Sequence, residues 1–311
     1  MSESYDVHTH VGLDLGFYLA GWWPYASTAH ELVGHLDRAG IDRAVCFPFT
    51  LPSAFDPYAF AAERVVRLQD GRVPFDRENE ALIREVKGLG LEDRLLPFAM
   101  FDPARCVSEQ LQRLESLVDS IAGLKTQSTS LQSPIRSLLG ASADLMGFAR
   151  DHDLPVLFHT AVHPEDRWAQ AADCLEVAKA HPNVRFNLAH SLRFDAVQLA
   201  AAVELDNVWI DCAAHLIHCR AAREGWPVVA TESRRVRSDY TSPAKVLEAV
   251  HAIVGDRYLW GSDHPYMSWC DDGITGIYRY DEEADVLDHL PDAVRTSMTS
   301  TAPRRWLTGT D

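Results

Sequence analysis

The stretch YDVHTH, residues 5–10, opens the chain with a short apolar run that closes on His8 and His10. Side chains alternate between the two faces of a β-strand, so residues i and i+2 point to the same side. If this stretch is a strand, both imidazoles lie on one face and can share a divalent metal. A His-x-His pair is weak evidence by itself, so the later segments must show whether other strands end in the same way.

Seven further β-like runs follow the first, and helical patterns separate most of them. In most intervals the apolar spacing changes to a period near 3.6 residues, which is typical of amphipathic helices. The expected strands are Asp6–His10, Ala44–Phe49, Leu95–Phe101, Ala122–Thr126, Pro155–His159, Arg185–His190, Val208–Cys212 and Tyr258–Asp263. Eight strands, each followed by a helix, predict a distorted (β/α)8 TIM barrel. A doubly wound nucleotide-binding sheet would need a Gly-rich loop after its first strand, and this chain has none.

The connections between these elements differ in length. Residues 50–78 follow the second strand and residues 213–241 follow the seventh, and both connections are long. Long loops at the carboxyl end of barrel strands often form lids or substrate walls, and we expect that role here. No linker rich in Gly, Pro or Ser divides the chain, so residues 1–311 are expected to form a single domain.

The composition limits the partners of the protein. A net charge of −16 argues against binding to nucleic acid or to an anionic membrane surface, both of which require clustered basic residues. Six scattered cysteines, without a signal peptide or an apolar span of about 18 residues, predict reduced thiols in a cytoplasmic protein. We expect a small-molecule substrate. A homodimer is left open, since dimers are the commonest assembly.

Polar residues end four more of the expected strands. Lys125 ends the fourth, His159 the fifth, His190 the sixth and Asp263 the eighth. The active site of a TIM barrel lies at this end of its strands, so these side chains are expected to converge with His8 and His10. Imidazole nitrogens and a carboxylate oxygen suit Zn²⁺, and Mn²⁺ and Fe²⁺ also accept them. Such a metal with an open position lowers the pKa of a bound water to about 7.

This combination resembles the metal pattern of the amidohydrolase superfamily. The segments Phe98–Pro103 (FAMFDP) and Gly261–Pro265 (GSDHP) are similar to the amidohydrolase 2 branch, which is related to 2-amino-3-carboxymuconate-6-semialdehyde decarboxylase. The resemblance extends from the first strand to the C-terminal helix. It is specific for the superfamily and leaves the reaction open.

The resemblance also implies roles for the strand-end residues. His8, His10, His159 and Asp263 would bind one metal, most often zinc. His190 and Asp263 would be the catalytic residues that orient the water and move its proton. In binuclear relatives a carboxylated lysine at the position of Lys125 bridges two metals, and histidines at the positions of His159 and His190 hold the second. We favour one metal, because that is the usual arrangement in the amidohydrolase 2 branch.

Other polar and aromatic residues on the loops after the strands are candidates for substrate contact. Aromatic side chains would form a wall for a planar or apolar substrate, and an arginine would pair with a carboxylate. The candidates are Lys125, Trp22, Trp23, His163, Arg167, Arg193 and His215. Asp211 ends the seventh strand, and we interpret it as a hydrogen-bond partner of a ligand histidine.

Two reactions fit this pattern. The leading hypothesis is a metal-dependent hydrolase, in which activated water attacks the carbonyl of an amide, lactone or ester. The alternative is a non-oxidative metal-dependent decarboxylase of an aromatic or unsaturated carboxylic acid. A cationic residue that faces the metal would favour the second reaction. A third interpretation, a barrel that binds a ligand without turnover, is at odds with the full set of metal-binding residues.

Overall fold

The computed structural model describes residues 3–270 and 275–310, and its centre is a sheet of eight parallel strands. These strands are β1 (Tyr5–His10), β4 (Arg43–Phe47), β5 (Leu95–Met100), β6 (Gly123–Thr126), β7 (Val156–Phe158), β8 (Phe186–Leu188), β9 (Val208–Asp211) and β10 (Tyr258–Leu259). Each pairs with the next one along the chain, so the strand order follows the sequence order. All eight expected strands are therefore present, and several are shorter than expected at their carboxyl ends.

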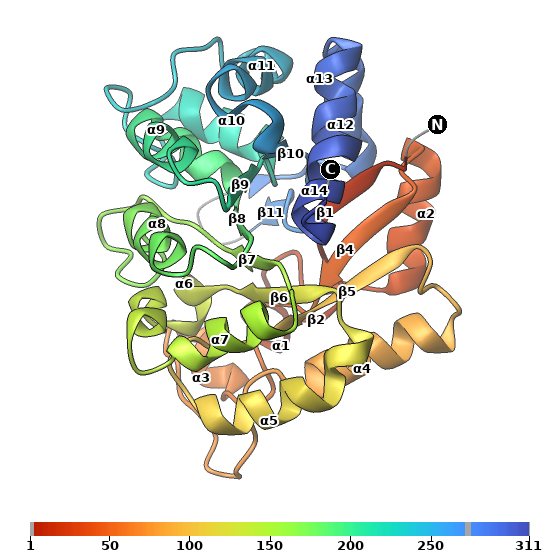
Figure 1. Ribbon diagram of the computed structural model, residues 1–311, viewed down its shortest axis with the longest axis vertical. Helices are drawn as coiled ribbons and strands as arrows, with labels where there is room; N and C mark the ends of the chain where they lie inside the picture. The colour runs from red at the N-terminus through yellow and green to blue at the C-terminus, as the bar shows by residue number, and fades with distance from the viewer. Residues whose placement is uncertain (1–2, 271–274, 311) are drawn as a thin grey trace.

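Helices lie outside the strands, as Figure 1 shows. Their bounds are α1 (Leu15–Ala20), α2 (Ala29–Ala39), α3 (Pro57–Ala61), α4 (Asp76–Gly88), α5 (Val107–Leu117), α6 (Ser128–Leu131), α7 (Ala143–Asp151), α8 (Ala171–Ala180), α9 (Ala196–Val203), α10 (His215–Glu224), α11 (Pro243–Val254), α12 (Tyr280–Asp285), α13 (Asp292–Thr296) and α14 (Ala302–Thr308). Local sequence explains where they begin and end. In α2, the Thr28 side chain accepts a hydrogen bond from the Glu31 backbone N–H, and Gly40 ends the helix in the left-handed conformation.

Backbone hydrogen bonds between the first and last strands close the barrel. The N–H of Val7 donates to the Trp260 carbonyl at 3.1 Å, and the N–H of Asp263 donates to the His8 carbonyl at 2.8 Å. A parallel bridge between Thr9 and His264 continues this pairing toward the carboxyl end. The predicted TIM barrel is confirmed, and its closure places His8 beside Asp263.

Short additional strands follow the carboxyl ends of the first and last strands of the barrel. Two short antiparallel ribbons pair β2 (Gly12–Leu13) with β3 (Ala26–Ser27), and β11 (Trp269–Cys270) with β12 (Thr275–Gly276). An antiparallel bridge joins Trp23 to Cys270 and thereby ties the loop after β1 to the loop after β10. Of the two long connections, residues 50–78 contain α3, and residues 213–241 contain α10.

The interior is apolar, and its cysteines are reduced. Cys46, Cys174, Cys212 and Cys219 are buried in the core, and all six cysteines are free thiols. This confirms the expectation of unpaired core cysteines. Among residues 3–270 and 275–310, no helix is long and apolar enough to cross a membrane.

Candidate metal centre

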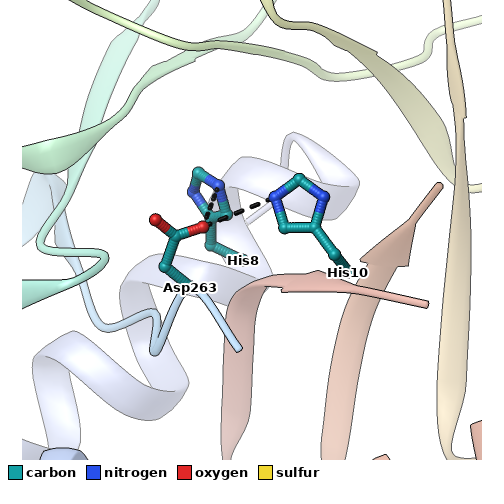
Figure 2. A group of neighbouring side chains, drawn as sticks. All are labelled: His8, His10 and Asp263. Carbon is teal, nitrogen blue, oxygen red and sulfur yellow. Dashed lines mark ion pairs between the residues drawn. The ribbon is translucent and has the colours of Figure 1, made fainter. Parts of the chain in front are cut away.

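Three side chains at the carboxyl end of the barrel form a group that can hold a metal ion. His8 and His10 come from β1, and Asp263 comes from the segment after β10 (Figure 2). The Nε2 atoms of His8 and His10 lie 3.2 and 3.4 Å from Asp263 Oδ1. One ligand atom from each residue lies within 4.8 Å of the other two, and all three side chains are buried.

The other ring nitrogen of each histidine is held by an acceptor. His8 Nδ1 lies 3.0 Å from Asp211 Oδ2, and His10 Nδ1 lies 3.0 Å from the Pro48 carbonyl oxygen. A carboxylate and a carbonyl can only accept hydrogen bonds, so both histidines carry their proton on Nδ1 when neutral. Their Nε2 lone pairs then face Asp263 and are available to a metal. The predicted contact between Asp211 and a strand-end histidine is thus observed.

The charges in the group suit a divalent cation. Burial lowers the pKa of His10 to about 4, so its imidazole is neutral at physiological pH. Burial by itself would raise the pKa of Asp263, but the neighbouring His8 and His10 side chains hold it well below its usual value. The group thus offers a neutral imidazole and an ionised carboxylate to a metal. This donor set fits Zn²⁺ and tolerates Mn²⁺ or Fe²⁺.

Lys125 lies beside this group at the end of β6. Its side chain is fully buried, with Nζ 3.4 Å from His8 Nε2 and 4.9 Å from the centre of the Phe47 ring. Burial lowers the pKa of the Lys125 amine to about 7. A metal bound to His8 Nε2 would replace the contact with the amine. Lys125, from the fourth strand of the barrel, therefore meets His8 from the first strand, as predicted.

His159 and His190 contact each other and Arg193. His159 Nδ1 lies 3.0 Å from His190 Nε2, and its Nε2 lies 3.1 Å from Arg193 Nη2. His190 Nδ1 lies 3.1 Å from the Ala213 carbonyl oxygen and 3.8 Å from Asp263 Oδ2. Both ring nitrogens of His159 therefore have partners outside the three-residue group. In the structure the expected fourth ligand lies next to the group without joining it.

A left-handed turn places His190 and Arg193 on the same cavity. The five residues from His190 to Phe194 all have positive φ, between 46° and 64°. None of them is glycine, so each residue costs roughly 1–2 kcal/mol relative to a right-handed conformation. Such strain persists only where the surrounding structure enforces it, and it is concentrated at functional sites. Here a hydrogen bond of 2.7 Å between Ser191 Oγ and the Tyr258 hydroxyl anchors the turn.

A cavity of about 240 Å³ opens above the metal-binding group. Four of the candidates for substrate contact line it: Trp22, Trp23, Lys125 and Arg193. His163 and Arg167 are not among the described residues that line it, and Arg167 is exposed to solvent. His215 is also absent from this lining, because its Nε2 contacts the Pro243 carbonyl at 2.9 Å in the core.

The cavity also contains residues that sequence reasoning did not single out. They are Phe17, Thr50, Gln127, Ser130, Tyr266 and Cys270. A usable signal existed for two of them, because Gln127 lies two residues after Lys125 and Tyr266 lies three residues after Asp263. The segments after β1 and β10 supply seven of the sixteen described lining residues, more than any other connections. Of the long connections, residues 50–78 contribute only Thr50 to the described lining, and residues 213–241 contribute none.

Comparisons with known proteins identify the family of this chain. The family model for amidohydrolases (Amidohydro_2) matches residues 5–308. No curated protein matches the chain in sequence.

Among solved structures, an amidohydrolase from Burkholderia multivorans with bound zinc has a TM-score of 0.64 and 13% identity, over 98% of this chain and 99% of that one. A protein from Pseudomonas putida assigned as a 2-pyrone-4,6-dicarboxylic acid hydrolase has a TM-score of 0.59 and 16% identity, over 99% and 98%. A 5-carboxyvanillate decarboxylase from Sphingomonas paucimobilis has a TM-score of 0.60 and 11% identity, over 100% of both chains. The barrel, the strand-end residues and the match of the family model over nearly the whole chain together show that this protein belongs to the amidohydrolase family.

Proposed function

We propose that this protein is a metal-dependent hydrolase that attacks the carbonyl of an amide, lactone or ester in a small molecule. The observation that carries this proposal is the position of the two oxygens of Asp263. Oδ1 lies 3.2 and 3.4 Å from the Nε2 atoms of His8 and His10, whereas Oδ2 lies 3.8 Å from His190 Nδ1. One oxygen is thus placed to bind a metal, and the other is left to handle a proton.

The chain's own residues supply the remaining chemistry. A divalent metal bound to His8, His10 and Asp263 would lower the pKa of a water molecule and polarise a carbonyl group. Asp263 would accept the proton from that water and later deliver it to the leaving group. His190 Nδ1 lies 3.8 Å from the same carboxylate, and its imidazole would hold the acceptor oxygen in place. The burial of Asp263 and His190 keeps bulk water away from this proton transfer.

The cavity wall indicates what kind of substrate fits. Trp22, Trp23 and Trp269 provide flat apolar surfaces, and Lys125 and Arg193 provide two cationic or amine groups deeper in the cavity. Stacked aromatic walls favour a planar substrate, and guanidinium groups pair with carboxylates. We therefore propose a planar substrate that carries at least one carboxylate.

Non-oxidative decarboxylation is the second candidate, and a specific observation favours it. A cationic group beside the metal ligands would hold a substrate carboxylate there, and Lys125 Nζ lies 3.4 Å from His8 Nε2. Protonation of the substrate carbon would then follow loss of CO2. The similarity to a decarboxylase supports only the shared fold, since the identity is 11%.

Isotope and gas measurements on the metal-loaded protein distinguish the two reactions. A panel of planar carboxylated lactones, esters and amides is assayed in H₂¹⁸O, and a panel of aromatic carboxylic acids is assayed for CO2 release. Hydrolysis predicts one ¹⁸O atom in the product, and Asp263→Asn should abolish it together with metal binding. His30→Gln, a change at an exposed histidine on α2, is the matched control and should keep full turnover. Release of CO2 without ¹⁸O incorporation would refute the hydrolase proposal.

A further inference from the structure

Gln127 reaches the cavity from the segment that follows β6. It lies two residues after Lys125, and side chains at positions i and i+2 of an extended segment point to the same side. The backbone at Gln127 is extended, with φ of −122° and ψ of 77°, so it continues the alternation of the strand. Gln127 and Lys125 both line the cavity, whereas the chain neighbours Thr126 and Ser128 are buried. Gln127 is therefore the next side chain to face the cavity after Lys125.

The start of α6 fixes one end of the Gln127 amide. The Oε1 atom accepts a hydrogen bond of 2.8 Å from the backbone N–H of Ser130 and caps the first turn of this helix. A backbone N–H only donates, so the amide oxygen, rather than the NH2 group, must face Ser130. The shape of an amide does not distinguish its oxygen from its nitrogen, but this contact does. The NH2 group is therefore at the opposite end of the amide.

This NH2 group is left without an acceptor in the protein. Within residues 3–270 and 275–310, no group accepts a hydrogen bond from Gln127 Nε2. The side chain is half-buried in the cavity wall, where water can satisfy its N–H groups before a substrate binds. A substrate that fills the cavity displaces that water. The two N–H groups then need an acceptor on the substrate, because a buried donor without a partner is unfavourable.

The charged and hydroxyl groups of the described lining do not make this distinction. Lys125 and Arg193 attract any anion, so they select the charge of a substrate. The Ser130 hydroxyl both donates and accepts, so it adapts to either kind of substrate group. Asp263, the only carboxylate among the described lining residues, belongs to the metal-binding group. Gln127 is uncharged and its oxygen is occupied, so it selects the direction of a hydrogen bond.

We propose that Gln127 determines specificity by requiring a second hydrogen-bond acceptor, a carbonyl or carboxylate oxygen, on the substrate. Two residues of extended chain span about 6.5 Å, so Gln127 begins about that far beyond Lys125. The acceptor is thus on a ring position that is not adjacent to the reacting group. The inference rests on the proposed function and deepens it, because it adds a second recognition group to the planar carboxylated substrate.

Binding of three benzoates to the Zn²⁺-loaded protein, measured by calorimetry, tests this proposal. The probes carry the same charge and differ at one ring position. 3-Acetylbenzoate has an acceptor there, 3-isopropylbenzoate has a similar shape without an acceptor, and 3-aminobenzoate has a donor. The wild type should bind 3-acetylbenzoate about 5- to 100-fold more tightly than the other two, because they leave the Nε2 donors unpaired.

Gln127→Glu reverses the selection without removing the helix cap. One carboxylate oxygen still accepts from the Ser130 N–H, and the other replaces the NH2 group in the cavity. In this variant 3-aminobenzoate should bind most tightly of the three probes. Gln112→Glu adds the same charge at an exposed position on α5 and should keep the wild-type order. A wild type that does not prefer 3-acetylbenzoate, or a Gln127→Glu variant that keeps this preference, would overturn the proposal.

A measurement on the wild type keeps the proposal testable if Gln127→Glu does not fold. The ¹⁵N and ¹H signals of the Gln127 NH2 group should shift on addition of 3-acetylbenzoate and much less on addition of 3-isopropylbenzoate. Equal shifts with both probes would also overturn the role of Gln127. Release of CO2 without ¹⁸O incorporation would refute the hydrolase proposal and leave the preference for an acceptor intact. Incorporation of ¹⁸O without that preference would refute only the role of Gln127.

Discussion

Replacing Asp211 by Asn tests how strongly the metal site depends on one buried carboxylate. Four groups donate hydrogen bonds to this side chain. Oδ2 accepts from His8 Nδ1 at 3.0 Å and from Asn187 Nδ2 at 2.8 Å. Oδ1 accepts from the backbone N–H groups of His190 and Ala213, both at 3.0 Å. An asparagine amide has one oxygen and one NH2 group, so in either orientation its NH2 group faces two donors.

The size of the effect follows from this count. Each buried donor that loses its acceptor costs about 1–3 kcal/mol, so two of them lower the free energy of unfolding by about 2–6 kcal/mol. If the NH2 group faces His8, it donates to Nδ1 and moves the imidazole proton to Nε2, the atom that must bind the metal. Loss of a group that orients a ligand weakens metal binding by about 10- to 100-fold, and we expect a loss in this range.

Two assays separate these effects. Urea denaturation of the metal-free protein measures the free energy of unfolding, and chelator competition with Zn²⁺ measures the affinity. Asp119→Asn, at an exposed aspartate, is the matched control and should change stability by no more than about 0.5 kcal/mol. An Asp211→Asn variant that behaves like this control in both assays would show that the contact with His8 does not orient the ligand.

Three further predictions concern the site and its surroundings. In Gly261→Ala the new Cβ would lie 2.8 Å from His8 Cβ, so the free energy of unfolding should fall by about 1–3 kcal/mol and Zn²⁺ binding should weaken. Gly147→Ala on α7 is the control, because the nearest atom to its new Cβ is 3.9 Å away. In the same urea assay this control should be neutral or stabilising by up to about 1 kcal/mol. The pKa of Lys125 falls from 10.5 to about 7 on folding, so the unfolded chain binds more protons between these values, and this group makes stability rise with pH by up to about 1.4 kcal/mol per unit. Lys125→Met has no amine to titrate, so its stability lacks this rise with pH. Any advantage in unfolding free energy of the metal-free variant over the metal-free wild type should therefore shrink from about pH 7.5 to about pH 9.5. If the two proteins show the same dependence of stability on pH, the amine is not buried. Zn²⁺ at about 100 times its Kd should add about 2.7 kcal/mol to the free energy of unfolding of the wild type. Calorimetry with and without a chelator measures this difference, and equal stability in the two conditions would contradict metal binding.

The sequence predicted those parts of the fold that depend on local periodicity. The start of α2 at Thr28 and its end at Gly40 follow from side chains within one turn of each terminus. The eight strands follow from short apolar runs, and their order follows from the alternation with helices. Because the carboxyl ends of all barrel strands meet at one end, the convergence of His8, His10 and Asp263 also followed once the barrel was inferred.

The conformation of the loops could not be predicted from the sequence. Arg167 was a candidate for substrate contact because it follows a strand that ends in histidine, yet it is exposed to solvent. Residues 213–241 were expected to shape the pocket, but the described residues of that connection are absent from its lining. Loops have no repeating dihedral angles, so spacing along the chain does not indicate which side chains turn inward.

The sequence by itself determined the barrel and the kind of site it carries, because apolar periodicity sets the strands and the residue at the end of each strand is read directly from the chain. Only the tertiary structure decided how those residues are used. Asp211 meets His8 across 203 positions of sequence, and a left-handed turn without glycine returns Arg193 to His159. Such contacts depend on the packing of the whole barrel rather than on local preference. That packing determines which of the strand-end side chains meet one another.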